Sequence, residues 1–209
     1  MRAIALVGGF LCFASFSLAG LITSDPGTGV TTIFTTTGNQ GFGNPGPVVL
    51  DGFTVTGSPQ VTYGNASYGL GGNGSWNSFS WVATNNGTGS ITFNLGGSFG
   101  LVGAFINYAP STGADATIEA LAANGTTVLE SYDLVTLAAI STPGGLNAGA
   151  FRGISRATND IAFLRLSGDF ILTHTLEIGS PAGVPEPGTF GLAAMALLSA
   201  VLVRRRRLS

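Results

Sequence analysis

Short apolar or alternating segments recur through the chain from Asp51 to Ile178, separated by Gly, Asn, Pro and Ser. Alternation with a period of two residues is the pattern of a half-buried β-strand, and the intervening residues are those that form turns. No segment keeps the spacing of an amphipathic helix, and Gly and β-branched residues are poor helix formers. Strand spacings of about ten residues are typical of β-sandwiches and jelly rolls. The sequence therefore predicts an all-β fold with a single β-sandwich or jelly-roll-like domain.

This domain is expected to span residues 47–180. The preceding segment, residues 20–46, is rich in Thr, Gly and Asn and is expected to form an irregular N-terminal arm or a loose leading strand. The predicted strands cover residues 53–56, 60–63, 78–83, 90–95, 101–108, 116–122, 127–134, 150–155, 161–167 and 170–178. The predicted core comprises Phe53, Val55, Phe79, Trp81, Ile91, Phe93, Leu95, Phe105, Ile118, Val128, Leu129, Tyr132, Phe151, Ile154, Ile161, Phe163, Leu166 and Leu176.

One turn has a specific signal. Asn124-Gly125 lies between two alternating segments, as expected for a β-hairpin with a two-residue turn and positive φ at both turn positions. In such a hairpin Ile118 and Ala120 share a face with Val128.

The N-terminal segment, residues 1–19, has the pattern of a secretory signal peptide. Arg2 precedes an apolar run over residues 4–16, and Ser17 and Ala19 are the small residues that a signal peptidase reads. A buried N-terminal helix is the alternative. The single cysteine, Cys12, lies in this segment, so its removal leaves no disulfide, thiolate metal site or cysteine nucleophile.

The C-terminal segment, residues 181–209, has three parts in order. The first is Val184, Pro185, Glu186, Pro187, Gly188 and Thr189; the second is the apolar run 190–203; the third is Arg204, Arg205, Arg206 and Arg207. The prolines keep the first part extended. The apolar run is short for a transmembrane helix, but flanking residues and snorkelling arginines can extend it into a transient span. The arginines are expected to stay on the cytoplasmic side.

This tail resembles the PEP-CTERM sorting signal, which consists of Pro-Glu-Pro, a transmembrane stretch and a terminal arginine cluster. The resemblance implies that a membrane exosortase cuts at or near the motif, after an inner-membrane intermediate, and that the protein reaches the cell surface or the medium. It also implies a link to exopolysaccharide and biofilm. A plain membrane anchor is the alternative, although an anchor does not need Pro-Glu-Pro.

The domain also resembles the ectodomains often found ahead of such tails. The matching features are the stretch 91–106, the Asn124-Gly125 hairpin, the stretch 151–155 and the stretch 161–179. This chain departs from them at Thr173-His174-Thr175, where an acidic pair is usual. A cation site at that turn is therefore in doubt.

Charge excludes one class of partner. Lysine is absent, and between Leu21 and Gly183 three arginines stand against nine acidic residues, a formal charge of −6. Such a domain cannot neutralise a run of phosphates, so no nucleic acid is expected as a partner.

The chain offers little for catalysis, and we expect no enzyme and no cofactor. His174 is the only histidine, and the one Gly-x-Ser-x-Gly match, Gly96 to Gly100, lies between two predicted strands and not before a helix, as a nucleophile elbow would. The carboxylates Glu119, Glu130, Asp133 and Glu177 could serve glycoside hydrolysis, but solvated strand faces explain them better. Asp115, Asp133, Asp160 and Asp169 could contribute to a calcium site, but no EF-hand or nonapeptide repeat is present. No metal site is therefore assigned.

The segment from Tyr63 to Trp81 interleaves aromatic residues with Gly, Asn and Ser. Tyr68 and Trp76 could stack on sugar rings, or they could cover a loop while Phe79 and Trp81 enter the core. Three functions follow as expectations. The first is a structural surface or matrix protein, the second a carbohydrate-binding module and the third an extracellular hydrolase.

Overall fold

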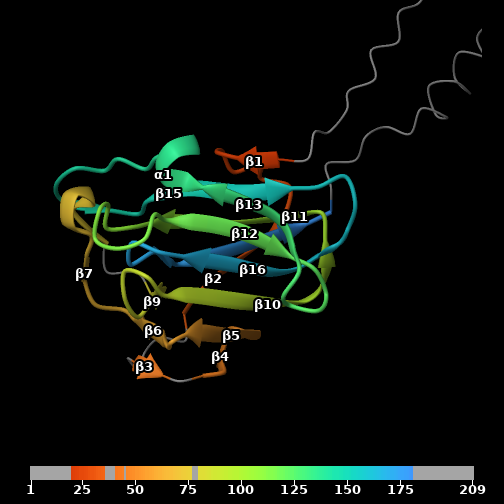
Figure 1. Cartoon of the computed structure of the whole chain (residues 1–209), viewed down its shortest axis with the longest axis horizontal. Coiled ribbons are helices and arrows are strands. Elements are labelled where there is room, and N and C mark those ends of the chain that lie inside the picture. The colour runs from red at the N-terminus through yellow and green to blue at the C-terminus, as the bar shows by residue number, and fades with distance from the viewer. Residues whose placement is uncertain (1–19, 36–40, 45, 77–79, 181–209) are drawn as a thin grey trace, which may run out of the picture. The chain divides into compact units, whose positions relative to one another are not determined.

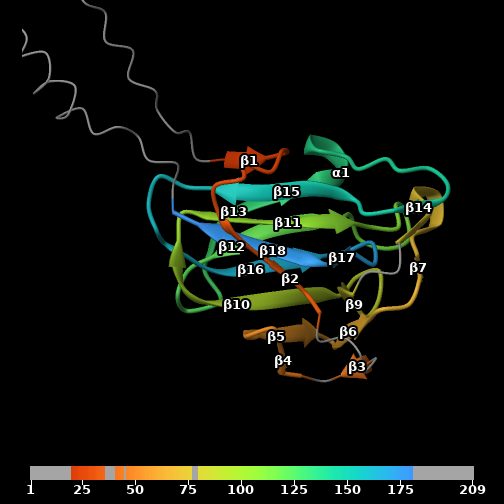
Figure 2. The ribbon, with the colours of Figure 1, turned by 180° about the vertical axis from the view of Figure 1, so that it is seen from behind.

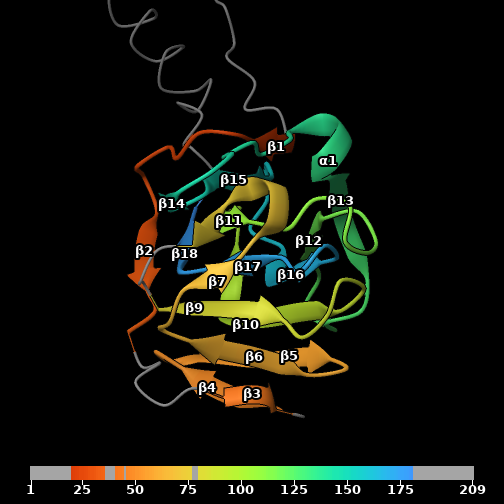
Figure 3. The same cartoon turned by 90° about the vertical axis from the view of Figure 1, so that its left-hand side faces the viewer.

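The computed structural model describes residues 20–35, 41–44, 46–76 and 80–180, whose regular structure is almost entirely β-strand (Figure 1). Residues Leu18–Ala182 form one compact unit, and the core described below belongs to it. Figures 1 and 2 view the unit from opposite sides, and Figure 3 shows its sheets from the edge. The predicted all-β sandwich is confirmed. The predicted signal peptide and sorting tail lie outside the described residues.

The larger sheet has nine strands in the order β1-β15-β11-β17-β9-β6-β3, while β18 pairs with β11 and β2 pairs with β18. The strands are β1 (Gly20–Ile22), β2 (Val30–Ile33), β3 (Gly41–Asn44), β6 (Val61–Gly64), β9 (Trp81–Thr84), β11 (Leu101–Asn107), β15 (Ala150–Ser155), β17 (Leu172–Thr173) and β18 (Thr175–Gly179). β11 is paired on both sides and is buried along nearly its whole length. β11 is therefore an interior strand of this sheet, with β15 on one side and β17 and β18 on the other.

The smaller sheet has six strands in the order β13-β12-β16-β10-β5-β4. They are β4 (Val48–Leu50), β5 (Phe53–Ser58), β10 (Ser90–Phe99), β12 (Thr117–Leu121), β13 (Val128–Asp133) and β16 (Ile161–Ser167). In β16 the buried Leu164 and Leu166 alternate with the half-buried Phe163 and Arg165. This alternation gives the strand one face toward the core and one toward solvent.

A third, three-stranded sheet joins β7 (Tyr68–Gly69), β8 (Ser75–Trp76) and β14 (Leu146–Asn147). The 3-10 turn η1 (Gly71–Asn73) connects β7 to β8, and a single α-helical turn, α1 (Leu134–Leu137), follows β13 of the smaller sheet. Asp133 caps α1, because its Oδ1 accepts hydrogen bonds from the Val135 and Thr136 amides.

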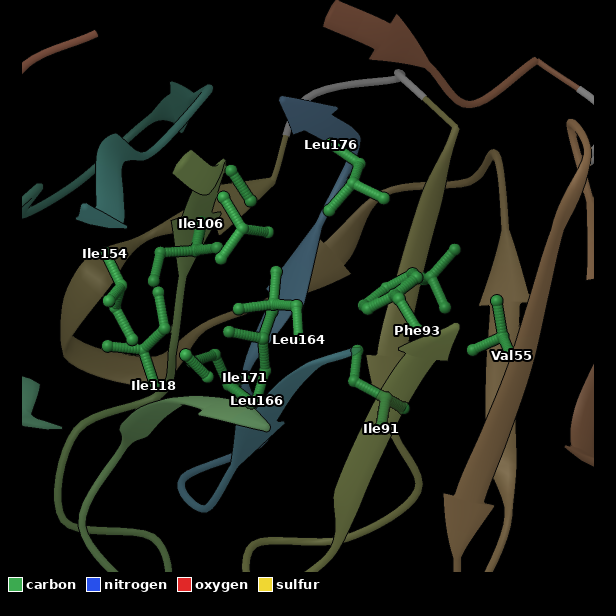
Figure 4. Packing of buried hydrophobic residues seen from close by; sticks show 14 of the residues in the cluster. Val55, Ile91, Phe93, Ile106, Ile118, Ile154, Leu164, Leu166, Ile171 and Leu176 are labelled. Atoms are coloured by element: carbon green, nitrogen blue, oxygen red, sulfur yellow. The ribbon is translucent and has the colours of Figure 1, made fainter. Parts of the chain in front are cut away.

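The core lies between the two large sheets, as the side chains in Figure 4 show. Val55, Ile91, Phe93, Ile118, Leu164 and Leu166 of the smaller sheet and Ile106, Ile154 and Leu176 of the larger sheet belong to one buried cluster. Most of the predicted core is buried or packed against this cluster. Val128 is a wrong prediction: it is 42% exposed, because it begins an edge strand beside a loop. Phe105 and Phe163 are half-buried, and Phe79 lies outside the described residues.

The predicted hairpin at Asn124-Gly125 is present, since β12 and β13 pair from Thr117↔Asp133 to Leu121↔Val128. The predicted two-residue turn is wrong. Residues 123–126 form the loop, closed by a hydrogen bond from the Ala122 amide to the Thr127 carbonyl (2.9 Å), and only Gly125 of the pair has positive φ (68°). Asn124 Oδ1 accepts from the Thr126 and Thr127 amides (3.1 and 2.9 Å), so its side chain takes the place of backbone partners.

The segment 20–46, predicted as an irregular arm, supplies three short strands. β1 pairs with β15, β2 pairs with β18 and β3 pairs with β6. β2 is largely exposed, so backbone pairing at the edge of the larger sheet orders it, whereas Leu21 of β1 also packs against the core. Sequence periodicity carries no signal for such strands.

The predicted strand 170–178 is divided. Asp169 and Phe170 have positive φ (41° and 51°), so the chain turns before β17, and β17 is separated from β18 at His174.

Candidate functional site

The two ends of the folded domain lie in one row of the larger sheet. Ser155 of β15 lies opposite Gly20 of β1 on one side and opposite Leu101 of β11 on the other, and Leu101 in turn lies opposite Gly179 of β18. Gly20 begins the first strand, Gly179 ends the last, and every pairing between them is antiparallel. The chain therefore enters and leaves the domain at the same end, with Gly20 and Gly179 three strand spacings, roughly 14 Å, apart.

A charged network lies beside the first of these ends. Tyr132 Oη donates to Glu130 Oε2 (2.5 Å), and Arg156 Nη1 donates to Glu130 Oε1 (2.6 Å). Arg156 also holds Asp160 through two bonds, Nε to Oδ1 (2.7 Å) and Nη2 to Oδ2 (2.9 Å). Leu21 makes a backbone hydrogen bond to Tyr132. This network, defined by Glu130, Tyr132, Arg156 and Asp160, is called the β1 network below.

The surroundings of the β1 network shift the pKa values of Tyr132, Arg156 and Asp160. Burial, then the hydrogen bond to Glu130, raises the pKa of Tyr132 to about 12, so its hydroxyl stays a donor. The bonds from Arg156 lower the pKa of Asp160, and those to Asp160 and Glu130 raise the pKa of Arg156. The ion pair between Arg156 and Asp160 therefore persists across the physiological pH range.

A second pair of acids lies where β2 approaches β18. Glu177 is only 2% exposed, and its Oε1 accepts a hydrogen bond from the Gly29 amide (3.1 Å). No donor among the described residues reaches its Oε2. Burial, and then contact with the Asp25 carboxyl, raises the pKa of Glu177. A β-carbon on Gly29 would lie 2.6 Å from the Glu177 side chain, so only glycine allows the arm to pass this close.

The two residues considered for sugar stacking are packed into the domain. Trp76 has no exposed surface, and it clusters with Leu70, Trp81, Ala83 and Leu172. Tyr68 is half-buried against the edge of the Trp81 ring, 4.8 Å between centroids, and burial raises its pKa to about 12. Trp76 is therefore corrected from a candidate sugar contact to a core residue, because its ring has no face open to a ligand.

Sequence reasoning missed a buried amide cluster formed by Asn73, Asn107 and Asn147. Asn107 Nδ2 donates to Asn147 Oδ1 (2.7 Å) and to Thr142 Oγ1 (2.9 Å), while its Oδ1 accepts from Asn73 Nδ2 (3.0 Å). Asn147 Nδ2 donates back to the Asn73 carbonyl (2.8 Å). The cluster fastens the loop around η1 to β11 and β14. Nothing in the local sequence distinguishes these asparagines from turn residues.

The four aspartates considered for calcium are not brought together. Asp133 caps α1 and Asp160 pairs with Arg156. Asp169 is 1% exposed and accepts hydrogen bonds from the Ser111, Thr112 and Gly113 amides (3.0–3.3 Å). Within the described ranges no three His, Cys, Asp or Glu side chains are grouped as metal ligands would be. The calcium hypothesis is not supported there.

The carboxylates considered for hydrolysis do not converge either. Glu119 of β12 lies opposite Ser131, whereas Glu130 of β13 lies opposite Ala120, so the two acids are on opposite faces of the smaller sheet. Glu119 pairs with Arg165 on its own face. His174 lies between the rings of Trp76 and Phe105 (5.2 and 6.0 Å), and burial lowers its pKa.

In the part of the chain that is described, no helix is long and apolar enough to cross a membrane. The predicted sorting residues, Val184 to Thr189 and Arg204 to Arg207, lie outside that part.

Comparison with known proteins identifies these C-terminal residues. Residues 183–207 match the PEP-CTERM protein-sorting motif. No curated protein and no solved structure matches the chain. The motif marks an exported protein that an exosortase sorts to the cell surface. The chain therefore carries a PEP-CTERM sorting motif, which follows the β-sandwich domain in the sequence.

Proposed function

We propose that this chain is a non-enzymatic surface or extracellular-matrix protein, processed at both ends during export and acting by association with exopolysaccharide. The observation that carries the proposal is the sorting motif at residues 183–207, which follows β18 almost directly. In this proposal signal peptidase removes residues 1–19, the tail then holds the chain as an inner-membrane intermediate, and the exosortase cuts near Pro187.

The placement of the chain ends supports two-ended processing. Gly20 is the first residue after the proposed signal-peptide cleavage, and it lies in the same row of the sheet as Gly179. Residues 180–184 separate Gly179 from Pro185 and reach about 17 Å when extended. Gly20 and Gly179, from which the two proposed cleavage positions are reached along the chain, thus lie at one end of the folded domain, so neither proposed cleavage requires the sheets to open.

The surface chemistry supports a role in a polysaccharide matrix. Charged residues make up 9% of the chain, against roughly 25% in soluble proteins generally, and lysine is absent. Such a surface can lie among neutral polymer chains without strong charge repulsion. The carboxylates considered for hydrolysis instead form ion pairs with arginines, cap α1 and accept a hydrogen bond from the N-terminal segment at Gly29.

The matrix role is tested by deleting the gene in the producing bacterium and measuring how much exopolysaccharide stays with the cells. The deletion is complemented with the wild-type chain or with a chain in which Pro185, Glu186 and Pro187 are alanine. We expect the wild-type chain, and not the triple variant, to restore cell-associated polysaccharide. A deletion strain that retains its normal polysaccharide would contradict the matrix role while leaving the sorting of the protein intact.

A further inference from the structure

The first strand of the domain touches the β1 network. The hydroxyl of Tyr132 lies 3.9 Å from the position that a β-carbon on Gly20 would occupy, and Tyr132 also bonds to the backbone of Leu21. The same hydroxyl donates to Glu130. The Tyr132 hydroxyl thus lies between the backbone at Gly20 and the Glu130 carboxylate.

The β1 network has an unbalanced charge. It contains two carboxylates, Glu130 and Asp160, but only one guanidinium, that of Arg156. Asp160 takes two of the Arg156 hydrogen bonds, whereas Glu130 receives one. The side chain of Glu130 is 13% exposed, so water compensates little of its charge. A cation next to Tyr132 would complete the network.

We infer that the β1 network is a binding site for the chain's own new amino terminus, the α-ammonium group of Gly20. The inference rests on the proposed removal of residues 1–19. Hydrolysis of the Ala19–Gly20 amide consumes one water, so Ala19 leaves as a carboxylate and Gly20 becomes a primary ammonium. In the precursor the same nitrogen is a neutral amide and makes no ion pair.

Cleavage of the signal peptide therefore strengthens the docking of β1. The strand is three residues long and pairs only with β15, so its backbone bonds alone hold it weakly. The ammonium adds attraction to Glu130 at the end of the strand that cleavage has freed. Removal of the signal peptide during export is thereby coupled to the docking of β1 on β15.

The test uses a chain from Gly20 to Ala182, which spans the compact unit, produced with a free Gly20 amine. NMR follows the Gly20 Cα shift with pH to give the α-amino pKa. We expect this pKa to lie above the ordinary range of about 7.7–8.0, because Glu130 favours the charged form. Glu130→Gln should return it to that range, and Glu119→Gln, a matched change on the opposite face, should leave it raised. An ordinary pKa in the unmodified chain would overturn the inference.

A second measurement covers the case in which Glu130→Gln does not fold. Acetylation of the Gly20 amine should lower the melting temperature at pH 6.5 and leave it unchanged at pH 10.5, where the amine is neutral. Equal melting temperatures at pH 6.5 would overturn the inference. Amino-terminal sequencing of the exported protein separates this result from the proposed function. A start other than Gly20 would contradict the proposed cleavage but would not alter the titration of the produced chain.

Discussion

Gly20 and Gly179 lie at the two ends of a single row of residues that crosses β1, β15, β11 and β18. The row fixes the entry and exit points of the domain by backbone pairing, at strands contributed by distant parts of the chain. The arrangement suits the proposed removal of both terminal segments.

Trp76 is expected to contribute to stability and not to ligand binding. Trp76→Ala should lower the free energy of unfolding by about 3–5 kcal/mol, because it removes a fully buried aromatic side chain. Leu146→Ala, at a residue that is 63% exposed in the neighbouring strand, should change it by less than about 0.5 kcal/mol. Urea unfolding followed by circular dichroism measures both. Equal stability of the two variants would show that the ring is not part of the core.

The stability that the amide cluster provides is expected to depend on its hydrogen-bond donors as well as on the shape of its side chains. Asn107→Asp keeps the size of the side chain but replaces the NH₂ group that donates to Asn147 and Thr142 with an acceptor. We expect a loss of about 3 kcal/mol or more at pH 7, with part of it recovered at pH 4, where the introduced acid can be protonated and donate. Asn94→Asp, at an exposed position, is the control. A loss for Asn107→Asp that does not vary with pH would contradict this account.

Asp169 is expected to act as a structural anchor. Asp169→Ala removes the acceptor for three amides of residues 111–113 and places alanine at a positive φ, so it should cost roughly 2–4 kcal/mol. Asp169→Asn keeps an acceptor oxygen and tolerates this φ, so it should cost less than half as much. Thermal unfolding with and without calcium measures both effects. A calcium-dependent rise in melting temperature that Asp169→Asn abolishes would instead make Asp169 a metal ligand.

Glu177 is expected to make the domain more stable in mild acid. Its pKa is raised from the ordinary value of 4.5, so the folded state holds the proton more tightly than the unfolded chain does. The resulting stabilisation is complete below pH 4.5 and is lost as the pH rises through the folded-state pKa. Glu177→Gln should remove this loss. Asp25→Asn should only reduce it, because burial is the larger cause of the shift. Urea midpoints between pH 4 and 8 measure the effect, and parallel curves for wild type and Glu177→Gln would contradict it.

Much of the fold could be predicted because buried and more exposed residues alternate along the strands of the core. Leu164 and Leu166 alternate with Phe163 and Arg165, and the same period marks β10 and β12. The hairpin could be predicted from Asn124-Gly125, but the length of its loop could not, because that length depends on which amides donate hydrogen bonds to the Asn124 side chain. β1 and β2 gave no signal, because their positions come from backbone pairing with β15 and β18.

The site residues were harder to predict for a related reason. Trp76 lies in a two-residue strand, too short for alternation to show which face is buried. Asn73, Asn107 and Asn147 come together only through the fold, and each is locally indistinguishable from a turn residue. The sorting tail could be recognised directly, because its function resides in a linear order of residues that requires no fold.

The intact mass of the protein from the producing cells and their medium, with and without the exosortase, tests the central claim most directly. The account predicts that the exported protein lacks residues 1–19 and the segment after about Pro187, and that the tail is retained when the exosortase is absent. A tail that is intact in both strains would make residues 184–209 a plain membrane anchor and would contradict processing at both ends.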